Sequence, residues 1–231
     1  RSMGEKLAIV SPKVQTTRHR IKGILTNENY QVIFSDTPGL IEPKYKLHEK
    51  MMQAVKSSLE DADVALLIVD IKDDLAQADE IFSSLRLKVP ALVVLNKTDV
   101  SDAATIEKAI AFFSEKKYCK KVVEISALRN KGVTELLEVI LSMLPDGEPF
   151  YVDDNLSDLP MKFFVSEMIR EKIFYLYAEE IPYSATVLVQ EFKEKTTLTK
   201  ISADIIVQRE TQKGIVLGHE GKMIRQLGTL A

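Results

Sequence analysis

The chain has 231 residues, of which 45% are hydrophobic and 28% charged, so it can bury a core of ordinary size. A formal net charge of -3 excludes a uniformly basic surface, so any area that attracts nucleic acid must be local. The single cysteine, Cys119, excludes an internal disulfide or a cysteine-rich metal site and fits a reducing compartment. No apolar run approaches the roughly 18 residues of a membrane-spanning helix, and no signal peptide is visible.

Residues 30 to 144 alternate between short apolar runs and amphipathic stretches. Strands are expected at 31–36, 64–69, 91–95 and 122–125, and helices at 48–59, 77–87, 105–115 and 133–144. The runs 64–69 and 91–95 are almost wholly apolar, which predicts strands buried on both faces of a mostly parallel sheet. Ligands of such sheets bind beyond the carboxyl ends of the strands.

The composition changes after Leu144, where a Pro- and Gly-containing segment opens a polar, acidic stretch. A helix is expected at 163–177, strands at 184–192 and 200–209, and a further helix near Gly221. The aromatic residues of the first helix are expected in the core, not as platforms for bases: Phe163, Phe164, Phe174, Tyr175 and Tyr177. We therefore predict an α/β domain at 4–144, a linker at 145–160 and a smaller α+β domain at 161–231.

A polar tetrapeptide, Asn96-Lys97-Thr98-Asp99, directly follows the apolar run that ends at Leu95. A carboxylate at Asp99 can accept hydrogen bonds from the N1–H and the N2 amine of guanine, whereas adenine would leave it poorly satisfied. Lys97 can lay its alkyl stem over the base, and Asn96 can tie this loop to a neighbouring one. A polar loop between a strand and a helix is the alternative for so short a pattern.

A possible magnesium and phosphate site follows the first expected strand, at Asp36-Thr37-Pro38-Gly39. Asp36 can hold a water bound to Mg²⁺, and the Gly39 N–H can contact a γ-phosphate in a loop that moves when this phosphate leaves. Thr17, in a polar and basic stretch, can complete the magnesium shell with its hydroxyl. Taken singly, these residues are explained as well by a β-turn and an exposed loop.

Ser126 and Ala127 follow the last apolar run of this region, where a backbone N–H can bond the O6 atom of guanine. A simple loop is the alternative for this pair. All four motifs, in this order on an alternating α/β pattern, resemble the translation-factor-like GTPases and, within them, the Era family. The stretch from Val14 to Arg20 is similar to the first switch region of that family.

The resemblance implies a P-loop-type GTPase domain that binds GTP or GDP with Mg²⁺, and it also suggests K⁺. Leu40 stands where Ras-like proteins place a glutamine that orients the attacking water. Because leucine cannot do this, the resemblance implies slow intrinsic hydrolysis or a water positioned by other means. We assign no catalytic residue.

The second domain carries a G-x-x-G loop at 218–221, ahead of the last expected helix. KH domains use such a loop to clamp about four nucleotides, although a turn at a helix start is the alternative. Its place after a helix and two strands resembles the type II KH domain of the Era family, which implies small-subunit ribosomal RNA as ligand. The candidate RNA-binding residues are Lys213, Gly218, His219, Glu220, Gly221, Lys222 and Arg225.

The sequence departs from the family at both ends. No G-x-x-x-x-G-K-[S/T] loop, which wraps nucleotide phosphates, occurs in the 231 residues, and the preceding strand has no counterpart. The KH domain also stops ten residues after Gly221, before the family's last strand. Either segments are left out between Met3 and Gly4, or the molecule is truncated. Because losing a central strand would leave an unpaired gap, we favour the first, which predicts a Met3–Gly4 distance above roughly 3.8 Å.

Our leading hypothesis is a GTP-hydrolysing, RNA-binding switch that acts in assembly of the small ribosomal subunit. The alternative is a non-catalytic RNA-binding assembly factor whose nucleotide domain is a scaffold, which the missing phosphate loop supports. A GTPase acting in tRNA modification or membrane traffic is a third reading, against which the G-x-x-G domain argues. The resemblance further implies a cytoplasmic monomer that associates peripherally with the inner face of the cell membrane.

Overall fold

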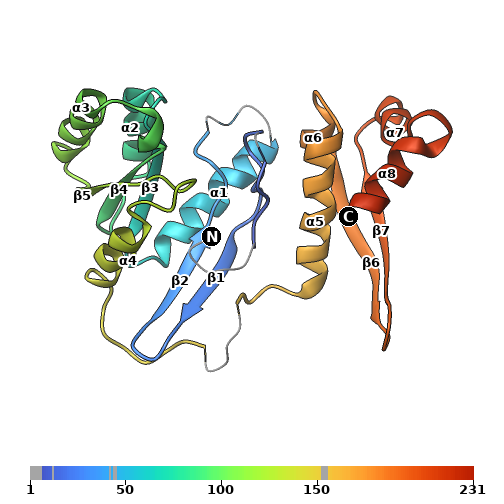
Figure 1. Ribbon diagram of the computed structural model, residues 1–231, viewed down its shortest axis with the longest axis horizontal. Coiled ribbons are helices and arrows are strands. Elements are labelled where there is room, and N and C mark those ends of the chain that lie inside the picture. Colours follow the sequence, from blue (N-terminus) through green and yellow to red (C-terminus); the bar gives the residue numbers. More distant parts are fainter. Residues whose placement is uncertain (1–6, 12, 42, 44–45, 152–155) are drawn as a thin grey trace.

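The computed structural model describes residues 7–11, 13–41, 43, 46–151 and 156–231, so the expectation about Met3 and Gly4 lies outside the described residues. The first region contains β1 (Ile21–Thr26), β2 (Gln31–Asp36), α1 (Lys46–Glu60), β3 (Ala65–Asp70), α2 (Leu75–Ser84), β4 (Ala91–Asn96), η1 (Thr98–Val100), α3 (Ala103–Ser114), β5 (Cys119–Glu124) and α4 (Val133–Leu141). The second contains α5 (Met161–Leu176), α6 (Ile181–Ser184), β6 (Thr186–Glu194), β7 (Thr199–Ile206), α7 (Glu210–Leu217), η2 (His219–Gly221) and α8 (Lys222–Leu230). Figure 1 shows these regions side by side. Among the described helices, none is long and apolar enough to cross a membrane.

The expected parallel sheet is present as β3, β4 and β5, with β4 in the middle and both pairings parallel. A second sheet consists of the antiparallel pair β1 and β2. The sequence did not predict β1, because its apolar residues Ile21 and Ile24 follow a polar, basic stretch without clear alternation. Both side chains are nevertheless buried, so tertiary packing selects the strand.

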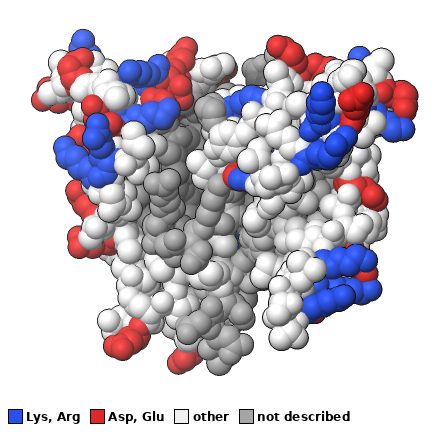
Figure 2. Space-filling model, turned by 45° about the vertical axis from the view of Figure 1, so that its right-hand side comes forward, with Lys and Arg blue, Asp and Glu red and all other residues white. Residues whose placement is uncertain are grey.

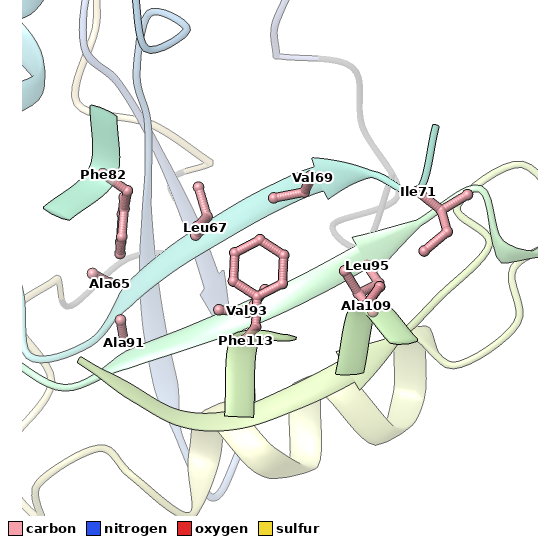
Figure 3. Close-up of a cluster of buried hydrophobic side chains, with 10 residues drawn as sticks. All are labelled: Ala65, Leu67, Val69, Ile71, Phe82, Ala91, Val93, Leu95, Ala109 and Phe113. Atoms are coloured by element: carbon pink, nitrogen blue, oxygen red, sulfur yellow. The ribbon is translucent and has the colours of Figure 1, made fainter. Parts of the chain in front are cut away.

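The main core lies on one face of the parallel sheet. Every residue from Ala91 to Leu95 is fully buried, as the apolar run predicts for a central parallel strand. Figure 3 shows Phe113 of α3 over this sheet and Phe82 of α2 at its edge. Burying side chains of this size contributes about 1.5–3 kcal/mol each, so this layer holds the β4 loop rigidly.

A deep cleft of about 2160 Å³ separates the two sheets of the first region. Its walls include Phe34 of β2 and Leu66 and Ile68 of β3, whose edges do not pair with each other. The prediction that the run 64–69 is buried on both faces is therefore wrong for Ile68, which is 60% exposed. Among the described residues, no strand pairs with this edge of β3.

The second region is α+β, as predicted. β6 and β7 form an antiparallel pair, α5 packs against β6, and α8 packs against α5, with Ile173 and Leu227 in the shared core. The aromatic residues Phe174 and Tyr177 are buried, but Tyr175 is 55% exposed and donates a hydrogen bond to the Val10 carbonyl. The core prediction was therefore wrong for Tyr175, because α5 turns this face toward the N-terminal segment.

The predicted linker is tied to the first region. The Ile24 N–H donates to the Leu156 carbonyl at 2.9 Å, and the Ser157 hydroxyl donates to the Lys22 carbonyl at 2.5 Å. Lys22 also forms an ion pair of 3.0 Å with Asp158. These bonds occupy the outer edge of β1, so this end of the connection has a defined path between the two regions.

Candidate nucleotide and RNA sites

Two loops at the carboxyl ends of β4 and β5 are joined by Asn96. Its side-chain oxygen accepts hydrogen bonds from the Lys97 N–H at 2.8 Å and from the Ala127 N–H at 3.0 Å. The amide and hydroxyl of buried Thr98 both donate to the Ile125 carbonyl, at 3.2 and 3.0 Å. The loops are adjacent because β4 and β5 are parallel neighbours, and these bonds give them one fixed relative position.

Asp99, the candidate base-reading carboxylate, lies in this joined loop with its side chain 16% exposed. Its Oδ2 is 3.8 Å from the Nε of Arg129, a residue that sequence reasoning did not single out. Arg129 is 74% exposed, so a ligand can displace its guanidinium at little cost. Asp99 is thus placed at the surface with acceptor oxygens available to a polar ligand edge.

Lys97 sits at the start of the same loop in the left-handed conformation, with φ of 63°. Its ammonium is 2.5 Å from an oxygen of Asp70, at the end of β3. Burial raises the pKa of Asp70, but the hydrogen bonds from Lys97 and the Lys72 backbone, together with the charges of both lysines, hold this pKa below its usual value. The bond to Asp70 raises the pKa of Lys97, so this side chain is a fixed cation.

Ser126 and Ala127 lie at the start of the loop that follows β5. Ser126 is fully buried, and its N–H donates to the Lys131 carbonyl at 3.0 Å. Since the Ala127 N–H donates to Asn96, both amides have partners inside the protein, and a bond to guanine O6 must share or replace one. Gly132, which sequence reasoning missed, closes this loop at φ of 74°, where a Cβ would lie 2.2 Å from the Glu124 carbonyl oxygen. Only glycine fits there.

The candidate magnesium residues meet at the end of β2. The Thr17 hydroxyl donates to Asp36 Oδ2 at 3.2 Å, so two oxygen ligands of the type that Mg²⁺ prefers lie together. Burial raises the pKa of Asp36, while hydrogen bonds from Thr17 and the Thr37 backbone oppose this rise. An Mg²⁺ ion would compensate such a desolvated carboxylate, so the donor set fits the metal.

Gly39 lies in open space beside the cleft: a Cβ on it would meet no atom within 4 Å. Its φ is not positive, so this conformation does not itself require glycine. Asp36 and Gly39 line the cleft, whereas Asn96 and Asp99 are not among its lining residues. In the described residues, the candidate base-reading loop and the candidate metal-side loop are therefore two separate groups.

The G-x-x-G loop is strained as a phosphate-approaching loop requires. Gly218 has φ of 68° and ψ of 176°, and Gly221 has φ of 73°. Glu220 between them is also left-handed, with φ of 53°. A Cβ on Gly218 would lie 2.5 Å from the Met223 side chain, whereas one on Gly221 would meet nothing closer than 3.8 Å. Gly218 therefore lets the loop fold onto α8, and Gly221 leaves open space.

The basic residues around this loop differ in what they contact. Arg225 donates to the carbonyls of Glu220 and Gly221, so it braces the loop from inside. Lys213 forms an ion pair of 3.1 Å with Glu210, and Lys222 is exposed at the first turn of α8. On the face in Figure 2, Lys and Arg side chains lie among Asp and Glu side chains instead of forming one broad basic area.

An α/β domain whose candidate nucleotide loops follow its parallel strands, followed by an α+β domain with a G-x-x-G loop, indicates a GTP-binding protein that carries a KH domain. Two family models support this class: one described as a 50S ribosome-binding GTPase matches residues 1–97, and one described as a KH domain matches residues 180–231. The predicted fold class is therefore confirmed.

The chain is similar to complete relatives as well. It is 40% identical to GTPase Era of a Thermoanaerobacter species, over 98% of this chain and 76% of that protein. It matches Era in complex with MgGDPNP and nucleotides 1506–1542 of 16S ribosomal RNA, with 36% identity, a TM-score of 0.92 and coverage of 99% and 79% of the two chains. It also matches an Aquifex aeolicus Era variant bound to GDP and AlF4⁻, with 35% identity, a TM-score of 0.92 and the same coverage. The chain belongs to the GTPase Era family, which confirms the predicted resemblance.

Proposed function

We propose that this protein binds GTP with Mg²⁺ through its first domain and small-subunit ribosomal RNA through its KH domain, and that GTP hydrolysis controls the RNA complex during assembly of the small ribosomal subunit. The observation that carries the proposal is the hydrogen bond from Ala127 to Asn96, which joins the two loops and presents Asp99 beside them. The similarity to an Era protein solved with MgGDPNP and 16S ribosomal RNA supports both ligands.

Guanine selection rests on Asp99, Lys97 and the β5 loop. The Asp99 carboxylate accepts from the N1–H and N2 amine of guanine, while the Lys97 stem covers one face of the base. Ser126 and Ala127 bring the backbone close to O6. An adenine in this place leaves the carboxylate facing an acceptor, at a cost of about 1–3 kcal/mol for each unsatisfied group.

Thr17 and Asp36 would hold Mg²⁺ on the metal side of the site, since their side-chain oxygens lie together at the end of β2. Mg²⁺, when bound, neutralises charge on the nucleotide phosphates. The Gly39 N–H contacts the γ-phosphate, so loss of this phosphate frees the loop. Leu40 packs against the main core and offers no group that can orient water, so we expect slow intrinsic hydrolysis.

RNA binding uses the open backbone of the G-x-x-G loop and the start of α8. Gly221 leaves the backbone accessible, and the helix N-terminus attracts a phosphate. Lys222 and Lys213 add positive charge, and Arg225 holds the loop in its binding shape. His219, with its side chain 83% exposed, and Glu220 are the outer contacts of the loop. The proposed boundaries are 4–144, 145–160 and 161–231.

Competition between GTP and ATP for the intact protein tests the base assignment. GTP should bind far more tightly than ATP. Asp99→Asn should weaken the binding of GTP and strengthen the binding of xanthosine triphosphate, whose C2 carbonyl accepts a hydrogen bond from the new amide. Glu107→Gln, an exposed carboxylate of α3 that lines neither the cleft nor the base-reading loops, is the matched control. Equal binding of GTP and ATP, or unchanged GTP binding by Asp99→Asn, would defeat the proposal.

A second experiment tests the RNA site. Gly218→Asp and Gly221→Asp should each weaken binding of a small-subunit ribosomal RNA fragment, because the added carboxylate repels phosphate. Gly147→Asp is the control, since a side chain at Gly147 meets open space away from the loop. Unchanged RNA affinity in the loop variants would remove the KH assignment.

The second candidate is an RNA-binding assembly factor without catalysis. The 231 residues contain no G-x-x-x-x-G-K-[S/T] loop, and the cleft between β2 and β3 is open. RNA binding without measurable nucleotide affinity would favour this function. The dependence on K⁺, the cytoplasmic location, the association with the inner face of the cell membrane and the monomeric state stay predictions of the family resemblance.

A further inference from the structure

The segment before β1 contacts the KH domain through two arginines, one from each region, each of which donates to backbone carbonyls of the other region. Arg18 donates to the carbonyls of Pro182 at 3.0 Å, Tyr183 at 2.6 Å and Ala185 at 2.9 Å, at and just after α6. In the opposite direction, Arg170 of α5 donates to the carbonyl of Thr16. Figure 1 shows this segment beside α5 and α6. The second domain thus contacts the residue that precedes the candidate magnesium ligand Thr17.

Arg170 is built into this position. Its side chain is 4% exposed, its Nε is 3.3 Å from Glu167, and its guanidinium lies over the Phe174 ring at 5.8 Å. Burial lowers the pKa of Arg170 to about 10, so this side chain remains charged at neutral pH. Burial likewise raises the pKa of Glu167. A buried cation with one flanking carboxylate needs a further acceptor, and the Thr16 carbonyl provides it.

Fixing the Thr16 carbonyl fixes the orientation of Thr17. The two share one planar peptide unit, so the direction of the Thr16 C=O fixes the Thr17 nitrogen and Cα and thereby restricts the directions in which the Thr17 side chain projects. The Thr17 hydroxyl in turn reaches Asp36 at 3.2 Å. A continuous path therefore runs from Glu167 and Arg170 in the second domain to the metal-side oxygens of the first domain.

We propose that Arg170 is a positioning residue for the nucleotide site: it holds Thr17 in the orientation that completes the Mg²⁺–GTP complex, although it belongs to the RNA-binding domain. This inference rests on the proposed role of Thr17 as a magnesium ligand. It goes beyond that role, because it assigns a residue of the KH domain to the assembly of the GTPase site. Attachment of the domains does not need Arg170, since bonds of Arg18 to Tyr183 and of Val10 to Glu171 and Tyr175 also join them.

The test compares Arg170→Met, Arg170→Lys and Thr17→Ala with the unaltered full chain. Lys172→Met is the matched control, because Lys172 lies on the same helix but contacts Glu171. Three quantities are measured for each protein: the Mg²⁺ concentration that half-saturates binding of a non-hydrolysable GTP analogue, the affinity for GDP, and the amide hydrogen exchange of residues 14–20 without metal or nucleotide.

We expect Arg170→Met to raise the half-saturating Mg²⁺ concentration by about tenfold, the loss typical of a removed outer-shell partner. GDP affinity should stay unchanged, and exchange of residues 14–20 should accelerate. The Mg²⁺ requirement of Arg170→Lys should lie between those of the unaltered protein and Arg170→Met, since lysine keeps the charge but lacks the planar guanidinium. A loss of affinity for both nucleotides, or Lys172→Met behaving like Arg170→Met, would show a merely structural role and overturn the inference.

Thr17→Ala separates this inference from the proposed function. If Thr17→Ala raises the Mg²⁺ requirement and Arg170→Met does not, the positioning role alone is rejected. If neither variant changes the Mg²⁺ requirement, or if the unaltered protein binds no GTP analogue, the proposed metal role of Thr17 is rejected, and this inference is rejected as well. Should Arg170→Met not fold, Glu167→Gln replaces it, because it removes the flanking charge while keeping the side-chain volume. Glu167→Gln with an unchanged Mg²⁺ requirement would then overturn the inference.

Discussion

The side-chain oxygen of Asn96 lies 3.0 Å from the backbone nitrogen of Ala127 and accepts its hydrogen bond across two adjacent loops. The two residues are 31 positions apart in the sequence. They meet because β4 and β5 are parallel neighbours, so the loops that follow them emerge at the same edge. Asn96 therefore joins the two loops of the proposed base-reading site, a role that requires no contact with the ligand.

Asn96→Ala should weaken guanine nucleotide binding by about 5- to 150-fold, which corresponds to about 1–3 kcal/mol for losing this acceptor. The Ala127 N–H then has no fixed partner, and only the bonds of Thr98 to the Ile125 carbonyl still join the two loops. Titration with a fluorescent GDP analogue measures the effect, with the exposed turn residue Asn29→Ala as control. Equal affinities of both variants would contradict an organising role.

Asp36→Asn should stabilise the metal-free protein at neutral pH. The folded pKa of Asp36 is raised above 3.8, because burial disfavours its charged form. The destabilisation that results is absent below pH 3.8 and complete above the raised pKa. The stability advantage of Asp36→Asn should therefore grow as pH rises through this window. Urea unfolding at several pH values without Mg²⁺ measures it, and an advantage that shrinks with rising pH is the contrary result.

Two neighbouring residues of β3 should respond very differently to truncation. Leu67 is 6% exposed and belongs to the main core, so Leu67→Ala should cost about 2–5 kcal/mol. Ile68 is 60% exposed at the cleft, so Ile68→Ala should cost less than about 1 kcal/mol. Denaturant unfolding of both variants measures these two losses of stability. A large loss for Ile68→Ala would mean that the cleft is filled in solution.

The two glycines of the G-x-x-G loop should also differ. Gly218→Ala meets Met223 and a backbone conformation reserved for glycine, so it should cost about 2–4 kcal/mol. Gly221→Ala should lower the stability only by the cost of a left-handed backbone at a residue with a side chain, about 1–2 kcal/mol. Thermal unfolding checks the order of the two losses, and the reverse order would argue against the described packing of α8 on this loop.

Much of the fold followed from local patterns. The run from Ala91 to Leu95 predicted a central strand because five consecutive apolar residues need cover on both faces. The same reasoning failed at Ile68, since an apolar run does not say whether a neighbouring strand is present. It also missed β1, whose alternation is weak, and the exposure of Tyr175, whose hydroxyl bonds to the N-terminal segment.

The amino-acid sequence by itself determined the family, the order of the two domains and the candidate loops, because these depend on residue types at short spacing. Only the tertiary structure showed that Asn96 reaches Ala127, that Arg129 stands at Asp99 and that Gly132 has no room for a side chain. Only the tertiary structure, likewise, placed Arg170 on the Thr16 carbonyl. Such contacts join residues far apart in the chain, and their distances are set by how the strands and domains pack.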